Sequence, residues 1–385
     1  MKIVHVLPSL ARGGGERLTI ELANRQVEAG HEVALILGSD LPAEQVHGGL
    51  DPRVEIHAIS SAKGRSRYAR MLPWIWRRKK WIAVQDVLHC HLTYGALFGS
   101  AFLRLGGPHR PAIVETYHAV GMPISPALKW LHARLATQWD GLTLMADDPW
   151  WRDFSRRHPD VVFRIIPVGV DPPSSVPAER RKSYRDALGI PKGARVVATV
   201  GRLVAERRPR AYVPVFERIA KLVPDVHFLM GGDGPERSAI ESDADSSGIR
   251  GRLHLTGLVR EIELPLAISD LYVTANVGSV PGVAGLQAVA AGLPVIAMQL
   301  REDYSLDPAD WIWSSNDPDA IAARAMELIG SPEMASELAD RQARHLRAHH
   351  SAEAMAANYN LFYRDAIQAE MGSGKKLSGS QNARN

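Results

Sequence analysis

Two segments of the chain, about half a chain apart, each pass from an apolar strand through a glycine turn into a helix start. The first runs from Lys2 to Leu10 and then through Gly13-Gly14-Gly15, and the second runs from Arg195 to Val200 and then through Gly201-Arg202. Backbone N–H groups and the helix dipole at such a junction favour an anion. The pattern predicts two α/β halves that hold a phosphorylated molecule.

The spacing of the other apolar runs predicts two parallel-sheet domains. The chain has 385 residues, more than the roughly 250 to 300 at which a single core stops growing. In both halves, β-branched runs alternate with helical stretches, as in parallel sheets. The expected strands are residues 2–9, 31–37, 54–59, 87–90, 112–116, 142–145 and 163–166, then 196–200, 226–230, 253–256, 271–274 and 294–297.

Domain limits follow from the breaks in this pattern. The turn over residues 167–173 is rich in proline and glycine, which interrupt both helix and sheet, so we expect a linker there. We place the first domain at residues 1–172 and the second at 180–350. A helix is expected over 351–370, and the polar residues 371–385 are expected to be disordered.

Several classes of protein are disfavoured by the composition. Cys90 is the single cysteine, which excludes an intrachain disulfide and a multi-cysteine metal site. Residues 285–300 form the longest apolar stretch, which is shorter than the roughly 20 residues that span a bilayer. The N-terminus shows no leader pattern, so we expect a cytoplasmic protein.

Cations and indole rings are interleaved between residues 65 and 81. This combination fits an amphipathic segment on an anionic lipid surface. RNA or an anionic polysaccharide is an alternative partner, and so is a solvated basic face with its tryptophans packed inward. Because the cations are confined to one segment, we expect no nucleic-acid partner. The expected membrane surface consists of Trp74, Trp76, Arg77, Arg78, Lys79 and Lys80.

Basic side chains also follow the strand that ends at Val200. Arg202, Arg207 and Arg208 would lie at the carboxyl edge of a parallel sheet, where such folds bind ligands. Arginine suits a diphosphate because it forms bidentate hydrogen bonds. A solvated basic loop is the alternative.

Seven short motifs, taken in order, resemble the retaining, nucleotide-sugar-dependent glycosyltransferases of family 4, which have the GT-B fold. The resemblance covers nearly the whole chain up to about residue 366. The motifs are the Gly-Gly loop after the first strand, Asp-Val-x-His-x-His at 86–91, Thr-x-His at 116–118, Ile-Pro-Val-Gly-Val-Asp at 166–171, Gly-Arg-Leu at 201–203, Gly-Asp-Gly-Pro-Glu at 232–236 and Ala-Ala-Gly-Leu-Pro-Val at 290–295.

The resemblance implies a fold, a reaction and a set of site residues. The fold would be α/β, with two Rossmann-like domains facing each other across a cleft and the C-terminal helix packed on the first. The reaction would move a hexose from a nucleotide diphosphate sugar to a lipid-linked or polysaccharide acceptor in bacterial surface glycan synthesis, without a metal or other cofactor, at the inner face of the membrane. Implied catalytic residues are His118, Arg202 and Arg207, and implied donor-binding residues are Gly14, Gly15, Gly201, Ser279, Gly282, Val283 and Gln287.

The chain departs from the family at two acids. Two glutamates usually precede the Ala-Ala-Gly-Leu-Pro motif, eight positions apart, where this sequence has Ser279 and Gln287. Gln287 can hydrogen-bond ribose hydroxyls without a charge. The substitutions leave open a catalytically weak or inactive homologue that acts as a binding or scaffold subunit. A GT-B enzyme of another reaction type, such as an epimerase or a phosphorylase, is a second alternative.

Overall fold

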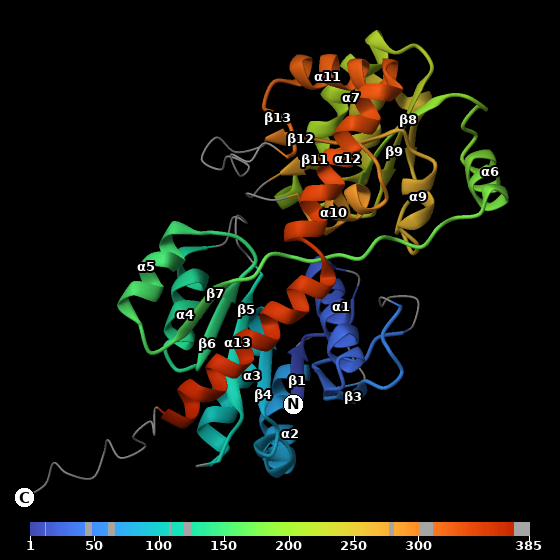
Figure 1. Cartoon of the computed structure of the whole chain (residues 1–385). Helices are drawn as coiled ribbons and strands as arrows, with labels where there is room; N and C mark the ends of the chain where they lie inside the picture. Colours follow the sequence, from blue (N-terminus) through green and yellow to red (C-terminus); the bar gives the residue numbers. More distant parts are fainter. Residues whose placement is uncertain are drawn as a thin grey trace, which may run out of the picture. The chain divides into compact units, whose positions relative to one another are not determined.

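The chain forms two compact units, each built on a parallel sheet (Figure 1). The computed structural model describes residues 1–385 except residues 12, 43–47, 61–65, 108, 119–124, 277–280, 300–310 and 373–385. The first unit comprises the described residues of 1–169 and the segment 352–372, and the second comprises those of 170–351. The chain passes from the first unit to the second at Gly169, inside the turn expected to be a linker.

The sheet of the first unit has seven parallel strands in the order β3-β2-β1-β4-β5-β6-β7. Because the order reverses between β1 and β4, these two strands form the topological switch point, beside which open α/β sheets bind ligands. The strands are β1 (Lys2–Leu7), β2 (Glu32–Leu37), β3 (Glu55–Ala58), β4 (Val87–His91), β5 (Ala112–Tyr117), β6 (Gly141–Leu144) and β7 (Val162–Ile165).

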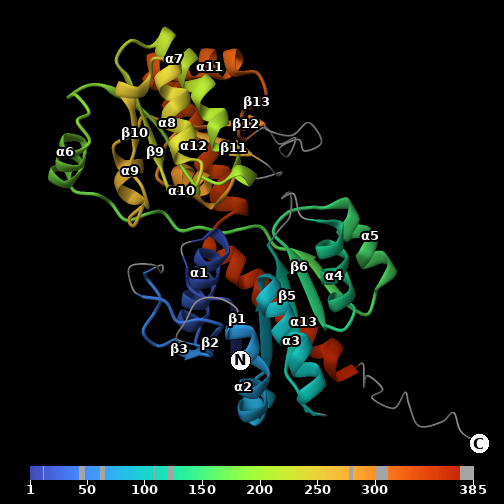
Figure 2. The ribbon, with the colours of Figure 1, turned by 180° about the vertical axis from the view of Figure 1, so that it is seen from behind.

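Helices cover both faces of this sheet (Figures 1 and 2). One face carries α1 and α13, which contact each other, and the opposite face carries α2 and α3. Successive side chains of a strand point to opposite faces of the sheet, so each face has its own apolar cluster. Val4 and Val6 pack in one cluster, and Leu7 packs in the other. The helices are α1 (Gly14–Glu28), α2 (Ser66–Ala83), α3 (Leu92–Leu105), α4 (Pro126–Ala136), α5 (Pro149–Arg157) and α13 (Ala352–Gly372).

The last helix, α13, belongs to the first unit although it comes from the end of the chain. Its Tyr359, Phe362 and Tyr363 are fully buried. A Cβ on Gly141 would lie 2.6 Å from the Phe362 ring, so glycine in β6 makes room for this helix. The helix continues to Gly372, two residues into the segment expected to be disordered, and 373–385 lie outside the described residues.

The second unit repeats the topology with six parallel strands in the order β10-β9-β8-β11-β12-β13, so its switch point lies between β8 and β11. Its strands are β8 (Arg195–Val200), β9 (Val226–Gly231), β10 (Leu253–Leu255), β11 (Leu271–Asn276), β12 (Val295–Gln299) and β13 (Ser314–Ser315). All the strands expected from the sequence are present. β13 was not expected, because two serines carry no apolar signal.

Helices α7 and α11 pack against each other in the second unit, and α10 packs against α12. One large apolar cluster of its core includes Phe216, Phe228 and Ile296. The helices are α6 (Ala178–Ala187), α7 (Tyr212–Leu222), α8 (Arg237–Ser246), α9 (Glu263–Ala267), α10 (Val283–Ala290), α11 (Pro318–Gly330) and α12 (Pro332–His349), with 3₁₀ turns η2 (Ala205–Arg207), η3 (Pro209–Ala211) and η4 (Arg250–Arg252).

Candidate functional site

In the first unit, the glycine loop after β1 lies against His118, which follows β5. A Cβ built on Gly15 would be 3.1 Å from His118 Nδ1, so a side chain at this position would press on the imidazole. Glu16, in the first turn of α1, places its carboxylate beside Gly13. That negative charge disfavours a phosphate at the start of α1. Gly14 begins the helix.

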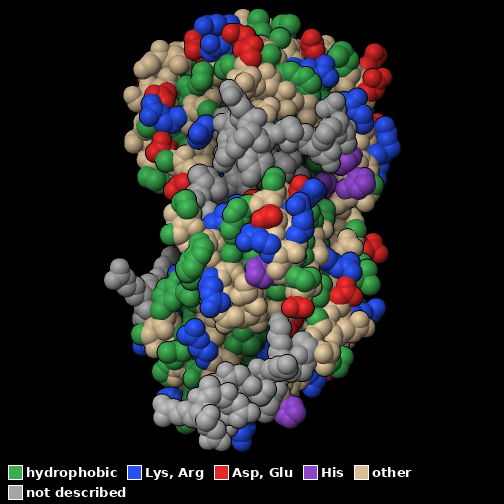
Figure 3. Space-filling view, turned by 90° about the vertical axis from the view of Figure 1, so that its left-hand side faces the viewer, with side chains coloured by type: hydrophobic (Ala, Val, Ile, Leu, Met, Phe, Trp, Pro, Cys, Tyr) green, Lys and Arg blue, Asp and Glu red, His purple; other side chains and the backbone are tan. Residues whose placement is uncertain are grey.

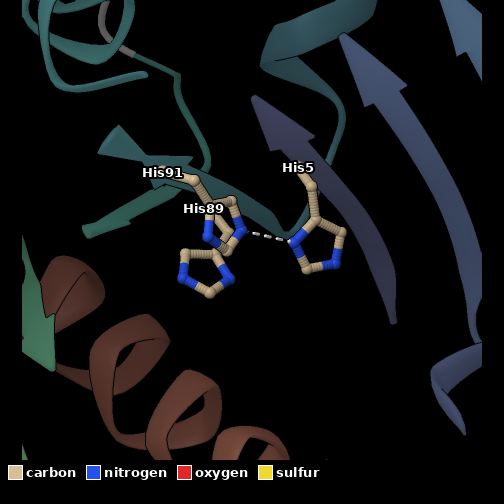
Figure 4. A group of neighbouring side chains, drawn as sticks. All are labelled: His5, His89 and His91. Carbon is tan, nitrogen blue, oxygen red and sulfur yellow. Dashed lines mark hydrogen bonds between the residues drawn. The ribbon is translucent and has the colours of Figure 1, made fainter. Parts of the chain in front are cut away.

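Behind His118, a chain of imidazole rings enters the unit from the switch point. His118 Nε2 is 3.1 Å from His91 Nδ1, and His91 Nε2 is 3.0 Å from His5 Nδ1. His5 Nε2 in turn lies 2.8 Å from Gln26 Oε1 on α1. Figure 4 shows His5 from β1 converging with His89 and His91 from β4. His5 pairs with His89 in the strand register, which places these rings on one face of the sheet.

A second row of polar groups ties α13 to the same cluster. His89 Nδ1 is 2.6 Å from the Tyr363 hydroxyl, and His89 Nε2 is 2.7 Å from Thr116 Oγ1. Thr116 Oγ1 is also 2.9 Å from the Tyr359 hydroxyl. Gln26 Nε2 donates to the Tyr363 hydroxyl at 3.3 Å, so Gln26 joins the two rows.

Burial keeps these histidines uncharged. It lowers the pKa of His5 to about 4, with a weaker opposing effect of the Gln26 hydrogen bond, and lowers the pKa of His118 to about 4. Burial and the neighbouring imidazoles hold the pKa values of His89 and His91 well below the usual range. At neutral pH each ring therefore carries one N–H and one lone pair.

Three of these rings also have the spacing of a metal site. One nitrogen from each of His5, His89 and His91 lies within 4.8 Å of the others. However, both nitrogens of each ring already face a protein hydrogen-bond partner. A metal ion would have to displace those hydrogen bonds, and the three ligands would bring no negative charge to offset its own. The hydrogen bonds account for the cluster.

In the second unit, the candidate site begins where β8 ends. Gly201 N donates to Gly231 O, and Leu203 N donates to Asp233 O at 3.0 Å, so the turn after β9 is bonded to the loop after β8. Gly232 has φ +141°, and a Cβ there would lie 1.8 Å from Gly201 O. Only glycine allows this approach, which fixes the path of Gly201 and Arg202.

Two guanidinium groups occupy this edge of the second sheet. Arg202 is exposed, Arg207 is half-buried in η2, and neither has an ion-pair partner among the described residues. Burial and the charge of Arg202 lower the pKa of Arg207. Two like charges held together without a carboxylate form a site that an anion would neutralise.

The second candidate element at this switch point is the N-terminus of α10, the helix that follows β11. Gly282 is its N-cap, no side chain caps it, and its first turn contains no acidic residue. The first N–H groups of the helix, from Val283 onward, have no intrahelical partner, so this end suits an anion. Gln287 lies on α10, one turn further and half-buried. Ser279 lies outside the described residues.

The residues expected to form a membrane surface divide between two sides of α2. Trp76 is 64% exposed, and Arg77, Arg78 and Lys80 are exposed with it. Trp74 is half-buried against Phe98, and Lys79 is half-buried. Leu72 and Tyr68, one and two turns before Trp76, are also exposed. Among the described helices, none is long and apolar enough to span a bilayer.

Some residues of the first-unit cluster were not expected from the sequence. The sequence alone places His89 and His91 only in the Asp-Val-x-His-x-His motif and gives His5, Gln26, Tyr359 and Tyr363 no part in a site. A usable signal was present, because His5 and His89 each lie two residues after the paired positions Ile3 and Val87 of neighbouring strands. No local pattern marks Gln26 or α13 as their partners.

The chain also matches known proteins. A family model described as Glycosyltransferase Family 4 matches residues 12–173, and one described as Glycosyl transferases group 1 matches residues 194–331. The two models cover most of both units. The chain therefore belongs to the glycosyltransferases of family 4.

Individual relatives are distant. The chain is 24% identical over 296 residues to an alpha-monoglucosyldiacylglycerol synthase of Acholeplasma laidlawii, covering 69% of this chain and 72% of that protein. It is 25% identical over 302 residues to the enzyme of the same name from Streptococcus pneumoniae, covering 73% and 67%. Anabaena Alr3699/HepE, solved with UDP and glucose, superposes with a TM-score of 0.73 at 14% identity, covering 94% of this chain and 98% of that one. This structural similarity supports the GT-B fold for the chain.

Proposed function

We propose that this protein is a retaining glycosyltransferase that moves a hexose from a nucleotide diphosphate sugar to a lipid-linked or polysaccharide acceptor in bacterial surface glycan synthesis. The observation that carries the proposal is the pair Arg202 and Arg207 at the switch point of the second sheet, for which the described residues provide no ion-pair partner. The Anabaena structure contains UDP, which supports a nucleotide donor here.

The second unit would supply the charge for the reaction. Negative charge develops on the diphosphate as its bond to the anomeric carbon breaks, and preorganised cations stabilise that charge. Arg202 and Arg207 are such cations, and the N-terminus of α10, with Gly282 and Val283, adds oriented N–H groups. Gly201 lets the backbone approach the diphosphate. This chemistry needs no metal ion and no further cofactor.

The first unit would orient the sugar. A neutral His118 offers a hydrogen bond to a sugar hydroxyl without competing for the diphosphate charge. Gly14 and Gly15 allow the backbone to come close to the donor because they carry no side chain. Glu16 makes this side unfavourable for the diphosphate itself.

A second candidate function is a homologue that binds the nucleotide sugar without turning it over. The observation that favours it is Gln287, which stands on α10 where the family usually has a glutamate. An amide can hydrogen-bond a ribose but lacks the charge that strengthens such bonds. Binding without nucleotide release would support this alternative.

We further propose that α2 rests on an anionic membrane, with the protein peripheral on the inner face. The relatives named as glucosyldiacylglycerol synthases support a lipid acceptor. The solvent side of α2 presents Leu72 and Trp76 beside Arg77 and Lys80, which suits a headgroup surface. Each nearby cation would contribute about 1 kcal/mol against an anionic leaflet.

A second face of the first unit has a similar mixture. In Figure 3, the face that carries α5 shows Lys and Arg side chains (blue) next to hydrophobic ones (green) in the lower half of the view. Trp130 on α4 is 65% exposed, whereas Trp151 is fully buried. Lys129 lies over the ring of Trp150. We propose α2 as the membrane surface because it places its exposed cations and apolar side chains on one helix.

The test is release of nucleotide from UDP- and GDP-hexoses in the presence of diacylglycerol vesicles or glycan acceptors. We expect one donor to be consumed with formation of a glycoside, and NMR of that product should show the anomeric configuration of the donor. Arg202→Ala should abolish release, and Arg210→Ala, which removes an exposed cation paired with Asp243, should not. No release with any donor, together with measurable binding, would support the non-catalytic function; neither release nor binding would contradict both.

A further inference from the structure

The hydrogen bonds of the imidazole chain in the first unit all run the same way from donor to acceptor. This direction follows from assigning the single N–H proton of each neutral ring. Gln26 Oε1 can only accept, so His5 Nε2 must donate to it. A neutral His5 then has a lone pair on Nδ1, and His91 Nε2 must donate to that lone pair. His91 Nδ1 then keeps a lone pair, to which His118 Nε2 donates at 3.1 Å. Thr19 Oγ1, 3.5 Å from the same nitrogen, donates its own proton to Gly15 O. The chain therefore ends with a lone pair on His118 Nδ1.

The second row of polar groups agrees with this direction. Gln26 Nε2 donates to the Tyr363 hydroxyl, which leaves the Tyr363 proton to be donated to His89 Nδ1. His89 Nε2 then donates to Thr116 Oγ1, and either oxygen can be the donor in the hydrogen bond between Thr116 and the Tyr359 hydroxyl. Rotating the Gln26 amide by half a turn would reverse every hydrogen bond of the imidazole chain, and the Tyr363 hydroxyl would then donate to Gln26 instead of to His89. One amide thus determines the tautomers of all the rings.

The surroundings of His118 provide an independent indication of the direction. The position of a Cβ on Gly15 lies 3.1 Å from His118 Nδ1, so a Cα hydrogen of Gly15 points toward that nitrogen. A C–H group is a weak donor that suits a lone pair, whereas an opposing N–H would be repelled by it. Nδ1 is buried and has no hydrogen-bond partner among the described residues. A buried acceptor left without a donor is uncommon and calls for a partner.

We propose that Gln26 is a positioning residue that holds His5, His91 and His118 in one tautomeric direction, so that His118 Nδ1 is a hydrogen-bond acceptor for a hydroxyl of the donor sugar. The part about the sugar rests on the proposed function. Gln26 is suited to this role because it is fully buried and is held at both ends of its amide. In the reversed direction His118 would offer an N–H, and the site would then select an acceptor group on the ligand.

The direct test reads the tautomers of the wild-type protein without any ligand. In ¹⁵N NMR of protein labelled at histidine, a ring nitrogen without a proton resonates far downfield of a protonated one, and His118→Asn assigns the signals. We expect His118 to carry its proton on Nε2 and none on Nδ1 at neutral pH. A proton on Nδ1 would overturn the proposal, whatever the protein's activity.

The role of Gln26 is tested with Gln26→Met, which keeps the volume and removes both hydrogen bonds. Gln342→Met is the matched control, because Gln342 is equally buried and bonds Val295 N and O in the second unit. Gln26→Met should give a mixture of His118 tautomers, and the control should not. An unchanged His118 in Gln26→Met would overturn the role of Gln26. If that variant does not fold, the wild-type spectrum still decides the direction.

Kinetics separate this inference from the proposed function. Gln26→Met should lower kcat/KM for the nucleotide sugar about tenfold, the effect of misplacing one hydrogen bond, while the inhibition constant of the free nucleotide stays unchanged. Equal weakening of nucleotide and nucleotide sugar would show damage to the whole protein and contradict a positioning role. If the wild-type protein binds neither, the proposed function has failed and the spectrum still tests the tautomers.

Discussion

The two sheets of this protein share one topology and place opposite chemistry at their switch points. Beside β1 and β4 lie neutral imidazoles whose hydrogen bonds are satisfied within the unit, except at His118 Nδ1. Beside β8 and β11 lie Arg202 and Arg207, whose positive charges have no acidic partner in the described part of the chain.

Under the proposed function, this difference would let each unit handle a different chemical end of a nucleotide sugar. Uncompensated charge gives affinity for an anion but little directional selectivity, whereas a fixed lone pair gives direction and little affinity. Even the helix starts follow this division, because α1 has Glu16 in its first turn and α10 has no acid there. The predictions below address each side of the comparison.

The largest effect is expected from removing both charges of the second unit. The double variant Arg202→Ala and Arg207→Ala should weaken binding of a nucleotide diphosphate by about 3 to 6 kcal/mol, since each charge-assisted hydrogen bond contributes about 1.5 to 3 kcal/mol. Calorimetric titration of the nucleotide diphosphate measures this loss of binding free energy. Arg210→Ala should bind like the wild type. Unchanged affinity in the double variant would remove this site from the second unit.

The second-largest effect is expected from disturbing the backbone contact that positions Arg202. Gly232→Ala should destabilise the second unit by roughly 3 to 5 kcal/mol, because its Cβ would meet Gly201 O at 1.8 Å with φ at +141°. Gly248→Ala also has a positive φ but open space around it, so its cost should be about 1 kcal/mol. Thermal or urea unfolding compares them. Equal losses would mean that the close approach to Gly201 does not matter.

The neutral histidines make the first unit sensitive to acid. Because folding lowers the pKa of His5 and His118 from 6.5 to about 4, the unfolded chain binds more protons between those values. Stability is therefore complete above about pH 6.5 and falls as the pH drops toward 4, by up to about 1.4 kcal/mol per pH unit for each residue.

Hydrogen exchange, corrected for intrinsic rates, measures this loss by segment. Between pH 7 and 5, peptides of β1, β4 and α13 should lose protection before those of β8 and β11. His5→Gln should reduce the pH dependence. Earlier loss of protection in the second unit would contradict the first-unit imidazoles as the dominant acid-sensitive element and would point instead to His227 and His254, whose pKa values burial also lowers.

The smallest effect concerns the membrane surface. Trp76→Ser should weaken binding to anionic vesicles by about 1 to 2 kcal/mol, because one exposed indole no longer enters the headgroup region. Trp130→Ser is a matched control, with almost the same exposure on α4. Vesicle sedimentation measures both. Greater loss in the control would move the membrane surface from α2 to α4 and α5.

Much of the fold could be predicted because each element has its own local signal. Alternating apolar runs predict the strands, and the seven motifs predict the family that the comparisons show. Strand β13 escaped prediction because two serines pair with β12 through backbone groups alone.

The candidate site could be predicted only where its residues lie in loops at the ends of strands. His118, Arg202 and Gly282 follow strands, so their neighbourhood can be inferred from parallel topology. Gln26 and Tyr363 are 337 positions apart and meet only when α13 packs on α1. No spacing in the sequence predicts that contact, and the tautomers that depend on it become apparent only in three dimensions.

The division of labour between the units is tested most directly by one matched set of titrations. A nucleotide diphosphate and its hexose conjugate would be titrated into the wild type, Arg202→Ala and His118→Ala. We predict that Arg202→Ala weakens both ligands, whereas His118→Ala leaves the nucleotide unchanged and removes only the affinity added by the hexose. Loss of nucleotide binding in His118→Ala, or an unchanged nucleotide affinity in Arg202→Ala, would contradict the account.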